Sequence, residues 1–310
     1  MRIVVIGGSG FIGSNIVRYF SSRHEVISCD SRAPRYIFRN VTYYTIGDDN
    51  IEKYADILEE GDYVVLLRWY GVAATSVSQQ ITSTEYNIIG TMKIMSICAE
   101  KNVHAVVFAS SGGTVYGIPE YTPIDEIHPT RPLSLYGNQK LMIENYIQMC
   151  TRLYGIRAYV LRISNPYGPG QEPFRGQGVV ATFLASAILG KKIEIWGDGS
   201  EARDYIYIDD LAQCFEKLIE YKGDEVIFNA GSGVETSIID IVNDVESVCG
   251  KTIVKEFMHA KDCQVKTNVL DCVKAKKELD WKADTTLEEG IKKMKESWNA
   301  QTTGFVLDVQ

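Results

Sequence analysis

Short apolar runs alternate with amphipathic stretches through the first half of the chain. The runs at residues 3–6 and 105–109 are continuously apolar, which is typical of parallel strands covered by helices on both faces. The same pattern predicts strands at residues 3–6, 25–29, 41–45, 63–67, 105–109 and 158–162. Helical periodicity lies between them at residues 10–21, 84–100 and 135–154. This alternation predicts an α/β fold with a doubly wound parallel sheet.

The pattern changes after residue 165. Proline and glycine are concentrated between residues 166 and 178, which predicts a long loop. A smaller α/β domain is predicted by the elements that follow, which are a helix at 180–190, a strand at 192–196 and a mixture of further helices and strands. Residues 226–229 predict a strand that returns to the main sheet. We therefore expect interleaved domains, the larger formed by residues 1–165 plus about 204–234 and the smaller C-terminal domain by about 166–203 and 235–310.

Composition narrows the classes of function. The net charge of −8 and a pI of about 5.2 argue against a general nucleic-acid binder. No apolar run approaches the roughly 20 residues that cross a bilayer and no signal peptide is evident, so we expect no membrane partner and a cytoplasmic location. The seven cysteines form no CxxC pair and the four histidines are scattered, so we expect reduced thiols and no metal site.

Three glycines follow the first predicted strand and precede a helical pattern. Gly7, Gly10 and Gly13 have the spacing GxxGxxG. In this context one glycine permits a tight turn, another lets the backbone approach a pyrophosphate, and the third lets helix and strand pack closely. The N-terminus of the following helix stabilises phosphate groups. The turn therefore predicts a dinucleotide site in a Rossmann fold.

Acidic residues after the next two strands bear on the choice of cofactor. Asp30 ends the second predicted strand, where a carboxylate can accept both ribose hydroxyls and repel a 2′-phosphate, so NAD is favoured over NADP. Arg32 and Arg35 leave NADP open, because an arginine just past this strand can pair with a 2′-phosphate. Asp48 or Asp49 could reach the adenine amino group, although each is also a common turn residue.

Tyr136 and Lys140 are four residues apart, so a helix places them on one face. A phenol with a pKa of about 10 is a poor base at neutral pH. A lysine ammonium and a positive nicotinamide ring both favour the phenolate and lower that pKa. The phenolate can then take a proton from a sugar or alcohol hydroxyl while hydride leaves the same carbon for NAD⁺. A serine or threonine in the polar run at residues 110–116 would position the substrate oxygen.

Ordered motifs along nearly the whole chain resemble the extended short-chain dehydrogenases/reductases. Within that group the sequence is most similar to the nucleotide-sugar epimerase/dehydratase family. The matching segments are GGSGFIGS at 7–14, YNIIGT at 86–91, SSGGTVYG at 110–117, YGNQK at 136–140, RISNPYGPGQ at 162–171, WGDGSEARDYIYIDDLA at 196–212 and KKELDW at 276–281.

The resemblance implies roles for individual residues. Asn87 is expected near the nicotinamide half of the cofactor, and Lys140 is expected to hold the nicotinamide ribose as well. Asn165 and Arg203 are expected at the diphosphate of a UDP-sugar substrate. The base packs near Trp196, and Val180 lines the nucleotide pocket. Further cofactor contacts are expected from Phe11, Ile12, Ser31, Leu66, Leu67, Arg68, Ser110 and Ile163.

The sequence departs from the family pattern near the predicted catalytic group. The usual catalytic serine or threonine position falls on Gly112. The role must then pass to a neighbour, for which we favour Ser111, with Thr114 and Ser110 as the alternatives.

Two further departures concern the binding sites. Arg68 and Trp69 stand where alanines are usual, so either this loop is displaced or Arg68 adds charge beside the pyrophosphate. A substrate arginine usually lies three residues before an aspartate near the C-terminus. Here His259 holds that place before Asp262, which leaves Arg203 as the main fixed positive charge for the diphosphate.

The residues after the serine pair distinguish reactions within the family. Dehydratases generally carry an Asp-Glu pair there and uronic-acid decarboxylases a glutamate, whereas this chain has Gly112, Gly113 and Thr114. We therefore expect NAD-dependent epimerisation of a UDP-linked hexose at C4, with UDP-glucose/galactose or their N-acetyl forms as substrates. The alternatives are a 4-reductase or dehydratase of the same family, or an NAD-binding regulatory homologue with impaired catalysis.

Relatives of this family commonly form dimers through a helix bundle, so we expect a homodimer. The predicted helices at 84–100 and 135–154 would supply the bundle. The candidate residues, most of them equally suited to the core against the sheet, are Ile88, Ile89, Met92, Met95, Ile143 and Ile147.

Overall fold

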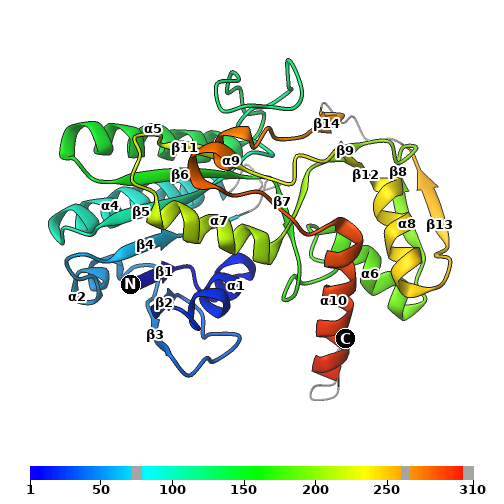
Figure 1. The fold of residues 1–310 in the computed structure, drawn as a ribbon, viewed down its shortest axis with the longest axis horizontal. Coiled ribbons are helices and arrows are strands. Elements are labelled where there is room, and N and C mark those ends of the chain that lie inside the picture. The colour runs from blue at the N-terminus through cyan, green and yellow to red at the C-terminus, as the bar shows by residue number, and fades with distance from the viewer. Residues whose placement is uncertain (72–78, 260–264, 303–310) are drawn as a thin grey trace.

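A seven-stranded parallel sheet forms the centre of the larger part of the molecule (Figure 1). The structure is a computed structural model that describes residues 1–71, 79–259 and 265–302. The strand order is β11-β6-β5-β4-β1-β2-β3, and every neighbouring pair is parallel. The chain order reverses between β1 and β4, where doubly wound sheets bind ligands. The strands are β1 (Arg2–Ile6), β2 (Glu25–Asp30), β3 (Val41–Thr45), β4 (Tyr63–Leu66), β5 (Ala105–Ser111), β6 (Ala158–Ile163) and β11 (Ile227–Ala230).

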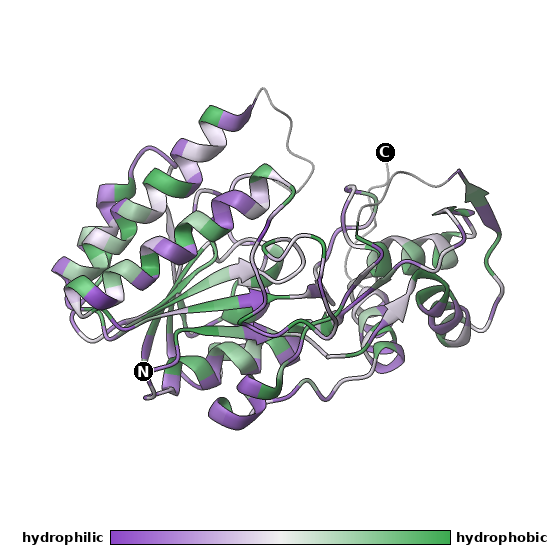
Figure 2. Cartoon of the chain, turned by 90° about the horizontal axis from the view of Figure 1, so that it is seen from above, coloured by the Kyte–Doolittle hydropathy of each residue, from purple (hydrophilic) through white to green (hydrophobic). Residues whose placement is uncertain are grey.

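Apolar side chains cover both faces of this sheet. In β1, Ile3 and Val5 belong to one buried cluster, and Val4 and Ile6 belong to another on the opposite face. Figure 2 shows the apolar strands enclosed between helices of mixed hydropathy. The continuous apolar runs of the sequence are explained by this double burial. The covering helices are α1 (Phe11–Phe20) and α7 (Ile208–Glu220) on the first face, and α4 (Gly90–Glu100) and α5 (Leu135–Tyr154) on the second.

The doubly wound sheet is thus confirmed, but the helix predicted at residues 84–100 has a different form. It begins earlier, as α3 (Gln80–Thr84), and passes through a π-helical turn (Glu85–Ile89) before α4. Within that turn the Asn87 amide is committed to tertiary contacts. Its Oδ1 accepts from Tyr70 N (2.8 Å), and its Nδ2 donates to Tyr70 O (3.0 Å) and Gln139 Oε1 (2.9 Å). Such turns are frequent at functional sites.

The second half of the chain builds a smaller group of helices and short strands, on the right of Figure 1. A loop at residues 168–178 leads into it, and β11 returns to the main sheet as expected. Its elements are β7 (Asn165–Tyr167), α6 (Val179–Leu189), β8 (Ile193–Trp196), β9 (Ala202–Arg203), β10 (Tyr205–Tyr207), β12 (Thr236–Ser237), α8 (Ile238–Cys249), β13 (Lys255–Met258), β14 (Thr267–Asn268) and α10 (Leu287–Thr302). Helix α9 (Val273–Leu279) instead lies beside β11 and α7 of the larger part (Figure 1). A 3-10 turn (Ile51–Lys53) and α2 (Tyr54–Ile57) lie between β3 and β4. Within the described ranges, no helix has both the length and the apolar character needed to cross a bilayer.

Candidate active site

A cleft of about 1430 Å³ lies at the carboxyl ends of the central strands and is walled by residues from both halves of the chain. Cavities for one small ligand usually measure about 300–1,000 Å³, so this one has room for two ligands. Most of the site residues expected from the sequence line it. They are Gly7, Gly10, Phe11, Ile12, Gly13, Asp30, Ser31, Asp48, Leu67, Arg68, Ser110, Ser111, Thr114, Tyr136, Lys140, Ile163, Asn165, Val180, Trp196 and Arg203.

Other expected residues do not line this cleft. Leu66 is buried in the opposite core cluster, because it points away from the face that Leu67 presents to the cleft. Asn87 is fully buried and does not reach the cleft surface. Its amide hydrogen-bonds with the backbone of Tyr70, which does line the cleft. Asp49 and His259 are exposed outside the cleft lining, and Asp262 lies outside the described residues.

The glycine turn is packed too tightly for side chains. Gly7 has φ of +96°, and a Cβ there would lie 2.8 Å from Arg68 N. A Cβ on Gly13 would lie 2.1 Å from Gly7 O. Only glycine tolerates both approaches. Helix α1 begins just after Gly10 with no side-chain cap, so its N-terminus is suited to an anion such as a pyrophosphate.

Asp30 is fixed at the end of β2. Its carboxylate is buried and accepts from Ser9 N (2.9 Å) and Arg32 N (3.0 Å). Arg35 is directed away from it, because its guanidinium donates to Gly170 O and pairs with Glu172. A carboxylate held in this way suits the hydroxyls of a ribose.

Arg68 places a buried cation in the cleft wall. The strand before it is not displaced, since Leu67 N donates to Ile6 O (2.8 Å). The guanidinium Cζ lies 3.3 Å from the ring centroid of Tyr86, and its Nη1 donates to Tyr86 O (2.6 Å). A Cβ on Gly90 would lie 2.5 Å from that Nη1, so Gly90 leaves room for the side chain. Burial lowers the pKa of Arg68.

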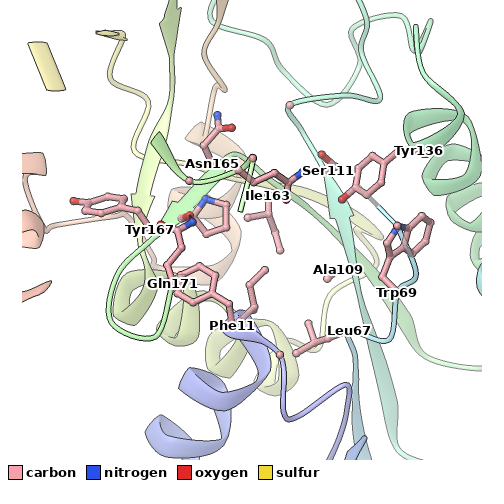
Figure 3. A pocket seen from close by; sticks show the side chains of 18 of the residues that line it. Phe11, Leu67, Trp69, Ala109, Ser111, Tyr136, Ile163, Asn165, Tyr167 and Gln171 are labelled. Atoms are coloured by element: carbon pink, nitrogen blue, oxygen red, sulfur yellow. Dashed lines mark hydrogen bonds between the residues drawn. The ribbon is translucent and has the colours of Figure 1, made fainter. Parts of the chain in front are cut away.

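Tyr136 lies beside Ser111 in the cleft (Figure 3), and Lys140 also lines it. Helix α5 presents Tyr136 and Lys140 on one side, and Ser134 caps it by accepting from Gly137 N (3.1 Å). Burial raises the pKa of Tyr136 to about 12, opposed by a hydrogen bond with Ser111. Burial also lowers the pKa of Lys140 to about 7, opposed by the negative charge of Glu144. Any positive charge placed beside Tyr136 would favour its phenolate.

Gly112 is packed closely against the buried side chain of Leu270, which would have to shift to admit the usual catalytic serine or threonine. A Cβ at this position would lie 2.6 Å from Leu270 Cδ1. Ser110 Oγ donates to Glu144 and is thereby occupied. Of the two remaining candidates, Ser111 is the one that hydrogen-bonds with Tyr136.

Comparison with known proteins agrees with this geometry. The model of the NAD dependent epimerase/dehydratase family matches residues 3–231. The chain belongs to this family. It is 31% identical over 309 residues to the UDP-glucose 4-epimerase of Mycolicibacterium smegmatis, covering 94% of this chain and 97% of that protein.

Solved structures show the same likeness over the whole fold. The Thermotoga maritima UDP-glucose 4-epimerase with UDP-glucose has a TM-score of 0.90 and 31% identity, covering 97% of this chain and 100% of that one. The Thermus thermophilus UDP-glucose 4-epimerase in complex with NAD has a TM-score of 0.87 and 27% identity, covering 99% of this chain and 100% of that one.

The residues of this family member fit a bound NAD. The three glycines of the turn carry no side chains, so a pyrophosphate can come close to the N-terminus of α1. The carboxylate of Asp30 is held in place and can accept hydrogen bonds from ribose hydroxyls. Opposite this half of the cleft, Asn165 Nδ2 donates to Asp204 O (2.9 Å). Arg203 is held by Ala202 O (2.8 Å) and Val265 O (2.9 Å), beside the cleft.

Four residues of the cleft carry buried polar atoms that the protein leaves unsatisfied. Among the described residues, the buried side-chain atoms without a hydrogen-bond partner are Trp69 Nε1, Thr114 Oγ1, Ser164 Oγ, Gln171 Oε1 and Asn268 Oδ1. All except the last belong to cleft-lining residues. Buried polar atoms are normally paired, so these atoms are suited to ligands. Sequence reasoning assigned no role to Ser164 or Gln171, although both belong to the matched segment at 162–171.

Proposed function

We propose that this chain is an NAD-dependent 4-epimerase of a UDP-linked hexose, with UDP-glucose and UDP-galactose or their N-acetyl forms as substrates. The observation that carries the proposal is the cleft itself. A single cleft brings the glycine turn and Asp30 together with Tyr136, Ser111 and Lys140. The 4-epimerase relatives of similar length support the same reaction.

In the proposed mechanism, Tyr136 moves the proton of the C4 hydroxyl. Bound NAD supplies the hydride acceptor and donor. Lys140 favours the phenolate form of Tyr136, which takes the proton as the C4–H bond breaks, and Ser111 donates a hydrogen bond to the C4 oxygen. The resulting 4-keto sugar turns in the cleft. Tyr136 then returns the proton to the oxygen as the C4–H bond forms on the other face, so the reaction needs no net oxidant.

The residues beside Ser111 favour epimerisation over water elimination. Gly112, Gly113 and Thr114 carry no carboxylate that could serve as acid and base at C5 and C6 of the sugar. Of these residues, Gly113 and Thr114 line the cleft, so a carboxylate here would have faced the substrate.

The proposed binding roles divide between the two parts of the chain. Residues 1–165 with about 204–234 would hold NAD, through the glycine turn and Asp30. Residues at about 166–203 and 235–310 would hold the UDP-sugar, with Arg203 at the diphosphate and Trp196 near the base. Asn165, at the end of the first range, would join Arg203 at the diphosphate. Asp30 also supports NAD over NADP, because Arg35 is engaged with Gly170 and Glu172. The other arginine left open by the sequence, Arg32, lines the cleft and pairs with Asp30 itself, with its Nε 3.4 Å from Asp30 Oδ1.

We also propose that the enzyme is a homodimer through α4 and α5. Ile89 in the π-helical turn, Met92 on α4 and Met142 on α5 are exposed although they are apolar, which is unusual for a helix face without a partner. The cytoplasmic location stays a prediction from the sequence.

The decisive test supplies each UDP-sugar to the purified protein without added NAD(H). NMR should then detect inversion of the sugar at C4. The variant Tyr136→Phe should lower the rate of this inversion by at least about 10²-fold. Mass spectrometry of the nucleotide released by denaturation should find NAD. Net NADPH consumption with a 4-keto sugar, and no inversion, would instead identify a reductase. Unchanged turnover in Tyr136→Phe would refute the proposed chemistry.

A further inference from the structure

A group of charged and aromatic residues adjoins Asp30 in the cleft. Ile46 N donates to Asp30 O (2.9 Å), so the turn that holds Asp48 begins directly beside the end of β2. Asp48, Arg68 and Tyr86 line the cleft, and the charge of Asp30 acts on the phenol of Tyr86. The base of a dinucleotide is attached to the ribose whose hydroxyls suit Asp30. This part of the cleft is therefore where the adenine of NAD would lie.

Asp48 is the aspartate of the turn that reaches this space. It lines the cleft, whereas Asp49 is exposed outside the lining. The side chain of Tyr86 hydrogen-bonds with Asp48. Burial raises the pKa of Tyr86 to about 12, and Asp48 acts in the same direction, so the phenol keeps its proton and donates a hydrogen bond to the carboxylate. A carboxylate has about four acceptor sites, so Asp48 can accept from Tyr86 and from a ligand together.

Arg68 holds Tyr86 through both its ring and its backbone. The guanidinium Cζ lies 3.3 Å from the ring centroid, and Nη1 donates to Tyr86 O (2.6 Å). The ring of Tyr70 packs against Tyr86 as well, with 5.7 Å between centroids. The charge of Asp48 acts on Arg68 too, so a cation, an aromatic ring and a carboxylate are coupled in this wall. Alanine, the usual residue at this position in the family, would make neither of the contacts of Arg68.

We propose that Tyr86, held by Arg68, is a positioning residue that fixes Asp48 as the acceptor for the amino group of the adenine. The inference rests on the proposed function, since it takes NAD as the bound cofactor. A side chain in an exposed turn samples several rotamers unless a neighbour selects one. Adenine presents an N–H donor at C6, whereas hypoxanthine presents a carbonyl oxygen there. A carboxylate fixed at this point binds the first and repels the second, so the clamp sets the preference for the base.

The experiment measures which base the purified protein retains. The protein is held with equal, excess concentrations of isotope-labelled NAD and nicotinamide hypoxanthine dinucleotide until the label shows that the resident nucleotide has exchanged. Free nucleotide is removed, the protein is denatured, and chromatography quantifies both dinucleotides. Wild type should retain at least about ten times more NAD than the hypoxanthine analogue, because a hydrogen bond to a charged group distinguishes them. Equal retention by wild type would overturn the inference.

Variants of the clamp should change this ratio. Tyr86→Phe keeps the ring beside Arg68 and removes only the hydroxyl, so it should lower the ratio by at least about 3-fold. Arg68→Ala should lower it as well, since the ring loses its clamp. In Asp48→Asn the ratio should fall to about one, because an amide can turn its oxygen to the amino group or its nitrogen to the carbonyl. The matched control Tyr121→Phe removes a hydrogen bond to Asp125 (2.9 Å) at an exposed site outside the cleft and should keep the wild-type ratio. An equal fall in both tyrosine variants would overturn the inference.

The outcomes separate this inference from the proposed function. A general loosening of the fold would weaken the binding of both dinucleotides and leave their ratio unchanged. An unchanged ratio in Tyr86→Phe or in Asp48→Asn therefore overturns the inference, while the proposed reaction stands. If Tyr136→Phe is active, the proposed reaction fails whatever the ratio is, and if wild type retains no NAD, both fail. Should Arg68→Ala fail to fold, Tyr86→Phe and Asp48→Asn still decide the inference.

Discussion

At the scale of single residues, Gly112 and Ser111 differ in their surroundings at the predicted place of the catalytic hydroxyl. A serine there would press its Cβ against Leu270, at 2.6 Å from Cδ1. Ser111, one residue earlier, instead hydrogen-bonds with Tyr136. The hydroxyl that orients the substrate oxygen is thus expected at the end of β5 and not in the turn that follows it.

Substitution of the hydroxyls tests this assignment. Ser111→Ala should lower kcat by about 10²- to 10⁴-fold, because it removes a group that acts on the reacting oxygen. Thr114→Val keeps the volume of the side chain and should have the smaller effect, since the hydrogen bond with Tyr136 remains. Both are measured by steady-state kinetics with the best UDP-sugar. A larger loss in Thr114→Val than in Ser111→Ala would move the role to Thr114.

Local motifs were the part of the site that the sequence could predict. The glycine motif is a short local segment, formed by Gly7, Gly10 and Gly13. The Tyr136–Lys140 pair lies within one helix. In both cases the spacing along the chain is enough to predict which residues lie close together. Trp69 is different because its contacts come from α5, which lies far along the chain. The sequence showed a bulky residue in place of alanine but not what it touches. Ser164 and Gln171 were missed for the same reason.

At the scale of elements, a buried charged network joins α5 to the sheet. Glu144 is fully buried one turn beyond Lys140 and pairs with Arg162 of β6 (2.7 Å). The same carboxylate accepts from Ser110 of β5, and Arg162 donates to Tyr116 OH (3.0 Å). The network fixes α5 relative to both strands, and so fixes Tyr136 and Lys140 above β5.

Breaking this pair should destabilise the protein strongly. Glu144→Ala leaves the Arg162 guanidinium buried without its partner, which costs about 3–5 kcal/mol in comparable pairs. Replacing both partners, as in Glu144→Leu with Arg162→Met, should recover part of that loss. The control is Glu120→Ala, which removes an exposed pair with Arg131 and should cost less than about 1 kcal/mol. Urea unfolding measures all three, and equal losses in Glu144→Ala and Glu120→Ala would contradict the role of the network.

Periodicity predicted most elements within one or two residues, including α5 and the returning strand β11. The segment before α4 is the exception. The sequence predicted a regular helix from residue 84, whereas the structure has a π-helical turn at Glu85–Ile89. That turn accompanies the bonds of Asn87 to Tyr70 and Gln139, which lie in other segments. A tertiary contact of this kind leaves no mark in a hydrophobic pattern.

At the scale of the whole molecule, the outer face of α4 and α5 is the surface suited to a second subunit. Four of the six candidates from the sequence, Ile88, Met95, Ile143 and Ile147, are buried in the core. The other two remain at the surface, where Ile89 is 46% and Met92 37% exposed, and Met142 is 54% exposed on α5. A helix face of this kind gains free energy when an equivalent face covers it.

Charges on this face should therefore separate the subunits. Size-exclusion chromatography with light scattering should give the mass of a dimer for wild type. The double variant Met92→Glu/Met142→Glu should have the mass of a monomer, because unpaired carboxylates at the centre of an apolar interface are costly to bury. The monomer should keep its far-UV circular dichroism, since both side chains point away from the core. Ile127→Glu is the matched control, an exposed apolar residue in a loop outside these helices, and it should stay dimeric. A monomeric wild type would contradict the proposed dimer, and a dimer that tolerates both glutamates would place the interface on another surface.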